Sequence, residues 1–142
     1  ANLIYGPSYI SLAYALSHYS LIPERVETVT SITNKKNKVF DTPLGRFSYR
    51  YINPSLFSYG ITLNKIDKFH TVLMATKEKA LCDYLYFSDK ITTNIQLKKY
   101  LFDDLRIKET VLKKFSLTKV KRLASLYEKN VKLFYKLLGS IK

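Results

Sequence analysis

The chain has 142 residues and a formal net charge of +13, from 24 Lys and Arg against 11 Asp and Glu. This length fits one domain with a buried core, and the excess positive charge favours a polyanionic partner, either nucleic acid or an anionic membrane surface. The single cysteine, Cys82, excludes an internal disulfide, and no apolar run reaches the roughly 18 residues of a membrane span. We therefore expect one basic domain, cytoplasmic and without a membrane partner.

The first half of the chain predicts a short helix followed by strands. Gly6-Pro7 is typical of a turn, Ser8 is a candidate N-cap, and an apolar stripe around Leu12 and Leu16 predicts a buried helix that ends before Pro23. Runs of β-branched and aromatic residues then predict five strands, at 26–33, 38–41, 46–52, 60–66 and 69–75. Their short connections favour antiparallel pairing, with a loop or short helix after Asn53.

From residue 76 onward the apolar spacing becomes helical. Thr76 is a good N-cap for a helix whose buried face includes Leu81 and Leu85, and further helices are expected from Thr93 or Asn94 to Leu101, over 107–114 and over 117–138. The predicted fold class is therefore α+β, a mainly antiparallel sheet of about five strands with an N-terminal helix and a C-terminal group of helices. The expected domain is 1–142, with no N-terminal winged helix-turn-helix.

The predicted helix 117–138 separates apolar from basic residues. An apolar seam with spacings of four and three runs from Val120 to Leu138, and the opposite side carries Lys121, Arg122, Lys129, Lys132 and Lys136. Three interpretations stay open: a solvated outer face, a face that contacts nucleic-acid phosphates, or a face that docks on a membrane or a partner helix.

A smaller basic group is expected on the strands. Lys35, Lys36 and Lys38 lie at a predicted hairpin tip, and Arg46 and Arg50 share one face of a strand. Together with the helix cations they are the candidate nucleic-acid-binding residues. Tyr49 and Tyr51, beside Arg50, are candidates for base stacking.

Patterns typical of catalysis or metal binding are weak. His18 and His70 are far apart, no His-x-x-x-His or Cys-x-x-Cys occurs, and Glu78-Lys79 lacks the Glu-x-Lys spacing of restriction-type nucleases. We expect no catalytic residues, no metal site and no cofactor.

Two segments carry a resemblance to a known family. Residues 5–24 (YGPSYISLAYALSHYSLIPE) and 74–86 (MATKEKALCDYLY), with 41–49 between them (DTPLGRFSY), resemble the antitoxin domain of the AbiEi family from bacterial abortive-infection toxin–antitoxin systems. The similarity covers roughly residues 3–90, with 91–142 as a helical tail that matches more loosely. Lys77 stands where the family usually has Pro, and Ser20 where Gly is common.

The resemblance implies a function. It suggests a non-enzymatic antitoxin and transcriptional-regulator domain that counteracts a nucleotidyltransferase-like toxin, without requiring direct contact, and assists autorepression of its operon. The DNA partner would be the operator, read by a winged helix-turn-helix that this chain lacks. The alternatives are a general nucleic-acid-binding module and, further off, a nuclease-like enzyme.

Overall fold

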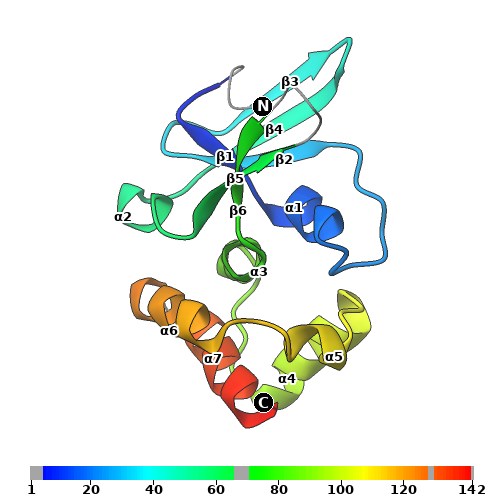
Figure 1. The fold of residues 1–142 in the computed structure, drawn as a ribbon, viewed down its shortest axis with the longest axis vertical. Helices are drawn as coiled ribbons and strands as arrows, with labels where there is room; N and C mark the ends of the chain where they lie inside the picture. Colours follow the sequence, from blue (N-terminus) through cyan, green and yellow to red (C-terminus); the bar gives the residue numbers. More distant parts are fainter. Residues whose placement is uncertain (1–4, 66–70, 128–129, 142) are drawn as a thin grey trace.

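The computed structural model describes residues 5–65, 71–127 and 130–141, with a sheet at one end and helices at the other (Figure 1). The strands are β1 (Ser8–Ile10), β2 (Val29–Thr33), β3 (Lys38–Thr42), β4 (Gly45–Tyr51), β5 (Ile61–Lys65) and β6 (Thr71–Ala75). The helices are α1 (Leu12–His18), α2 (Pro54–Phe57), α3 (Lys77–Tyr86), α4 (Asn94–Lys98), the π-helix η1 (Lys99–Asp104), α5 (Glu109–Leu112), α6 (Leu117–Leu126) and α7 (Asn130–Ile141).

The predicted α+β class is confirmed, and the sheet among the described residues has six strands rather than about five. Their order is β3-β4-β2-β1-β6-β5. Pairs β3/β4, β2/β1 and β6/β5 are antiparallel, whereas β4/β2 and β1/β6 are parallel. The sheet is therefore mixed, and both parallel pairs flank the central pair β2/β1.

Strand β1 is the element that the sequence did not predict. Residues 8–10 were expected to start a helix, with Ser8 as its cap, but they form a fully buried strand in the middle of the sheet. The helix begins only at Leu12, after Ser11 in extended backbone. A three-residue strand is too short to show the alternation that separates strand from helix, and its pairing partners, such as Ser31 and Met74, lie far away in the chain.

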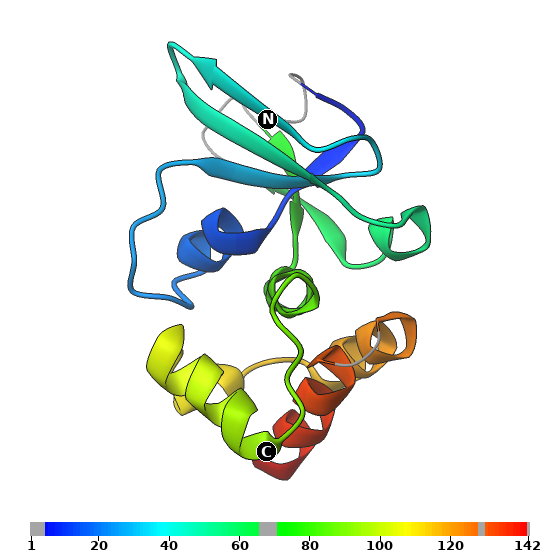
Figure 2. The same ribbon diagram turned by 180° about the vertical axis from the view of Figure 1, so that it is seen from behind.

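Helix α3 lies between the sheet and the C-terminal helices, where it is seen end-on from both sides (Figures 1 and 2). It contacts α1, β6, α6 and α7. Ala80, Leu81, Cys82 and Leu85 have no exposed surface, which confirms the predicted apolar face. Thr76 caps the helix as predicted, because its Oγ1 accepts a hydrogen bond from the Lys79 amide at 3.3 Å.

The predicted single helix over 117–138 is wrong, because α6 ends at Leu126 and Tyr127 adopts extended backbone with ψ 154°. The apolar seam is nevertheless buried on both sides of the break. Two polar anchors explain the change of direction. The Tyr127 hydroxyl bonds to Asp83, and the Asn130 side chain donates to the carbonyls of Leu85 at 2.8 Å and Asp89 at 3.0 Å.

Other boundaries differ by a few residues. Asn53 caps α2 through its side chain at 3.0 Å from the Ser55 amide, so the expected loop or short helix is a helix. The helix expected from 93 or 94 to 101 continues as η1 to Asp104, and the one expected over 107–114 is confined to Glu109–Leu112. The connection between the predicted strands 60–66 and 69–75 lies outside the described residues, as does His70.

We predict that Leu85→Ala lowers the free energy of unfolding by about 2–5 kcal/mol, because Leu85 is fully buried where α3 meets its neighbours. Urea denaturation followed by circular dichroism measures this loss. Ile95→Ala is the matched control, since Ile95 is 81% exposed and its truncation should change stability by less than about 0.5 kcal/mol. A loss below about 1 kcal/mol for Leu85→Ala would contradict a core position.

Candidate functional site

The segment that resembles the AbiEi motif forms the end of β6 and the whole of α3. Its first acidic residue, Glu78, is buried and accepts a hydrogen bond at Oε2 from the Ser116 amide at 3.0 Å. Ser116 is the N-cap of α6. Glu78 therefore ties the start of one helix to the start of another, and its carboxylate also lies in the first turn of α3, where negative charge is favourable.

Lys79 and Asp83 form a buried ion pair one turn further along α3. Neither side chain has any exposed surface, and Lys79 Nζ lies 3.9 Å from Asp83 Oδ1. The ammonium also donates to the Leu56 carbonyl and, at 2.8 Å, to the Tyr127 hydroxyl. The Tyr9 and Tyr127 ring centroids lie 5.3 and 5.1 Å from the same nitrogen, so the charge is enclosed by aromatic faces that attract cations.

Three hydroxyl groups donate to the Asp83 carboxylate. Tyr9 Oη and Ser11 Oγ reach Oδ2 at 2.9 and 2.7 Å, and Tyr127 Oη reaches Oδ1. Burial raises the pKa of the Asp83 carboxyl, although the Lys79 charge and the three hydroxyl donors oppose this shift. Burial likewise lowers the pKa of the Lys79 ammonium, against the attraction of Asp83.

This cluster joins the two segments on which the family resemblance depends. Tyr9 and Ser11 come from the first segment, whereas Lys79 and Asp83 come from the second. A further bond links them, since Tyr19 Oη donates to the Ala75 carbonyl at 2.7 Å. The polar groups of Tyr9, Ser11, Lys79 and Asp83 therefore bond to one another inside the protein. Their chemical role is to hold separate parts of the chain together.

Gly60 shows how tightly the cluster is enclosed. It has φ +85°, and a Cβ atom there would lie 2.9 Å from the Lys79 Cβ. Its carbonyl accepts a hydrogen bond from the Thr76 amide at 2.8 Å. The close approach of β5 to α3 therefore requires glycine at this position.

Nine of the ten candidate nucleic-acid-binding residues are described, and all nine are exposed; Lys129 lies outside the described residues. The structure separates them into several places. Lys132 and Lys136, on α7, line a shallow groove together with Lys90, whereas Arg122, on α6, lies over the Tyr59 ring at 5.5 Å. The expectation of one basic helix face is therefore wrong, because the break after Leu126 divides it.

The strand candidates do not form one surface either. Arg46 pairs with Asp41 at 3.6 Å, and Lys35 lies 5.6 Å from the Tyr5 ring centroid. Arg50 instead points toward the helices and lies 4.4 Å from the Phe87 ring centroid. Tyr49, a candidate for base stacking, is only 3% exposed and packs on Tyr5, so its ring is not available to a base. Tyr51 is 46% exposed.

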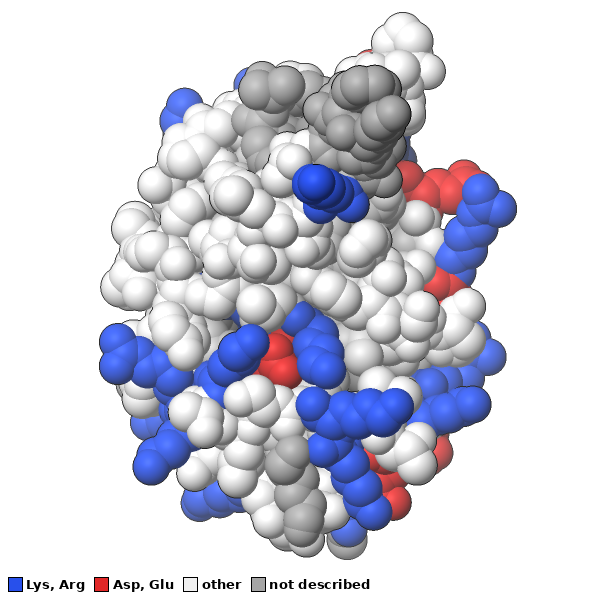
Figure 3. Space-filling view, viewed as in Figure 1, with Lys and Arg blue, Asp and Glu red and all other residues white. Residues whose placement is uncertain are grey.

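On one face of the molecule, positive charge is concentrated over the helical half. On the face shown in Figure 3, Lys and Arg side chains gather below the sheet, and the surface over the sheet is largely free of them. No cluster of three His, Cys, Asp or Glu that could hold a metal ion occurs within 5–65, 71–127 and 130–141. No helix of the described chain is long and apolar enough to cross a membrane.

Comparison with known proteins found no protein-family model that matches the chain and no curated protein that is similar to it.

The cluster around Lys79 and Asp83 was not predicted from the sequence. The signal that could have found it is the Lys-x-x-x-Asp spacing, which places both charges on one side of a helix otherwise rich in apolar residues.

We predict that Asp83→Ala lowers the free energy of unfolding by about 3–5 kcal/mol, because it leaves the Lys79 ammonium buried without its carboxylate. Lys79→Met combined with Asp83→Ala should recover part of this loss, since the uncompensated charge is gone. Urea denaturation of the single and double variants measures both. Asp103→Ala, which removes an exposed carboxylate, is the control. Loss of less than about 1 kcal/mol in Asp83→Ala would show that the pair is not structural.

Proposed function

We propose that this chain is a non-enzymatic antitoxin and transcriptional-regulator domain similar to that of the AbiEi family. In this role it counteracts a nucleotidyltransferase-like toxin in the cytoplasm and assists autorepression of its operon. Recognition of the operator would fall to a winged helix-turn-helix in the full regulator, and direct contact with the toxin is not required.

One observation supports this function above the others. The two segments that resemble the family were matched separately in the sequence, and they interlock in the structure around Lys79 and Asp83. Contact between the two segments in the core is what a shared scaffold would require. Because Glu78, Lys79 and Asp83 are buried, the similarity of this segment is best understood as preservation of a scaffold, which favours a binding or regulatory role over catalysis.

The antitoxin function predicts a separable activity. Expressed with its cognate nucleotidyltransferase-like toxin, this chain should restore growth, because it contains both matching segments. It should leave an operator-driven reporter unrepressed, because the helices and strands of the described residues do not form a winged helix-turn-helix. Growth and reporter output are measured in parallel, with Asp103→Ala as a folded control and Asp83→Ala as a destabilised one.

Two results would contradict this prediction. Failure to restore growth, with folded protein present in the cell, would show that this chain alone does not supply antitoxicity. Strong repression of the reporter by this chain would show that the operator is read here.

A second candidate function, general nucleic-acid binding, is favoured by the exposure of all nine described candidate cations. Reversing three of them on the helices, Lys121→Glu, Arg122→Glu and Lys136→Glu, should weaken binding to duplex DNA and reduce the slope of log affinity against log salt by about three. Fluorescence anisotropy at several salt concentrations measures both quantities. The matched control reverses three exposed cations outside the candidate set, Arg25, Lys108 and Lys114. If affinity and slope both stay unchanged in the helix variant, those cations are only solvated.

A further inference from the structure

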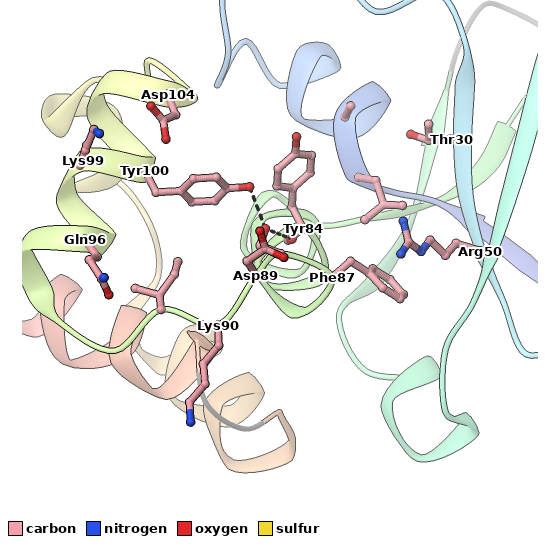
Figure 4. A pocket seen from close by; sticks show the side chains of 14 residues that line it. Thr30, Arg50, Tyr84, Phe87, Asp89, Lys90, Gln96, Lys99, Tyr100 and Asp104 are labelled. Carbon is pink, nitrogen blue, oxygen red and sulfur yellow. Dashed lines mark hydrogen bonds between the residues drawn. The ribbon is translucent and has the colours of Figure 1, made fainter.

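A cavity of about 720 Å³ lies between the sheet side of the molecule and the C-terminal helices. Its walls come from the start of α1, the end of α3, the connection 88–91, and the helical stretch formed by α4 and η1. Figure 4 shows Arg50 reaching toward Phe87 on the sheet side, the Tyr84 ring next to them, and the Tyr100 ring projecting from the opposite, helical wall. The cavity is separate from the buried Lys79–Asp83 cluster.

Aromatic rings form much of the lining. Tyr84 and Tyr100 are stacked, with ring centroids 6.5 Å apart and an interplanar angle of 29°. Ser88 holds the Tyr100 side chain in place, because its Oγ donates to the Tyr84 backbone carbonyl at 2.7 Å and lies 2.7 Å from the Tyr100 hydroxyl. The Arg50 guanidinium lies over the Phe87 ring at 4.4 Å. Flat rings beside a planar cation are the groups on which unstacked nucleobases pack.

Positively charged side chains line both the cavity and the surface next to it. Arg50, Lys90 and Lys99 line the cavity, together with two exposed carboxylates, Asp89 and Asp104. Lys90 and Ile91 are shared with the adjacent groove of about 330 Å³, which adds Lys132 and Lys136 from α7. The joined surface therefore holds five cations against two carboxylates. The groove suits phosphates, and carboxylate oxygens inside the cavity can accept hydrogen bonds from base amino groups.

The backbone around the cavity is unusual in two places. Leu12, which lines it, has φ 60°, a left-handed conformation that is costly for a residue with a branched side chain. On the opposite wall, η1 is a π-helix in which the Leu105 amide bonds to the Tyr100 carbonyl at 2.9 Å. Such segments are rare and often occur at functional sites.

We propose that this surface binds single-stranded nucleic acid. One unstacked base enters the cavity beside Tyr84, Tyr100 and Phe87, and the neighbouring phosphates lie along Lys90, Lys132 and Lys136. A double helix fits this arrangement poorly, because its bases are paired and stacked. This binding mode rests on the second candidate function, nucleic-acid binding, and does not require the antitoxin activity.

The direct test uses the unmodified protein and four 12-nucleotide probes in fluorescence anisotropy: single-stranded RNA, single-stranded DNA of the same sequence, the DNA duplex, and the DNA strand with abasic sites. We expect a single strand, RNA or DNA, to bind about tenfold more tightly than the abasic strand, which has the same charge, because the abasic strand lacks the base that would stack in the cavity. We also expect it to bind more tightly than the duplex. Equal affinity for the abasic and base-bearing strands would overturn the base cavity while leaving nucleic-acid binding in place. Absence of binding to every probe would overturn both.

Two pairs of variants locate the binding surface. Lys132→Glu with Lys136→Glu should weaken single-strand binding at least about tenfold, whereas the same change of charge at Lys121 and Arg122 on α6 should have a smaller effect. Tyr100→Phe should keep the affinity because the ring remains, and Tyr100→Leu should lower it about tenfold, with folding checked by thermal melting. Equal losses in the two charge-reversed proteins would overturn the assignment to this groove.

Discussion

The rest of the structure depends on the buried contact between Lys79 and Asp83. Two charges without exposed surface are costly unless each is paired and hydrogen-bonded. Here the partners are drawn from β1, the residue before α1, the last turn of α2 and the residue after α6. The ion pair therefore requires all four of these parts to be in place at once, which is how a single turn of α3 fixes the sheet relative to the C-terminal helices.

This arrangement also determines what the far end of α3 can do. With its first turns locked by the Glu78 and Lys79 contacts, α3 carries Tyr84, and just beyond it Phe87 and Ser88, to the edge of the cavity. A site built on such a rigid support loses little entropy when a ligand binds. Helix α3 thus contributes to two features: the buried cluster around Lys79 and Asp83, and the basic cavity, which is open to solvent.

Local signals in the sequence were sufficient to predict some helices and strands but not others. Helix α3, its cap Thr76 and strands such as β4 were predictable, because apolar spacing and capping act over a few neighbouring residues. Strand β1 and the break at Tyr127 were not, since both are set by hydrogen bonds to distant partners. The same limit applied to the candidate site. Lys132 and Lys136 were identified in the sequence, but Lys90 in the same groove and Tyr100 in the adjoining cavity come from segments that only the fold brings into this region.

Native-state hydrogen exchange tests most directly whether the cluster joins the sheet and the C-terminal helices into one cooperative unit. If it does, amides in β1, α3, α6 and the buried part of α7 should exchange with the same, highest free energy of opening, and Lys79→Met should lower that value in all of them together. The opposite outcome is equally clear. If α6 and α7 exchange several kcal/mol more easily than β1 and α3, or if the Lys79 variant affects α3 alone, the two halves are stabilised separately and the cluster does not hold them together.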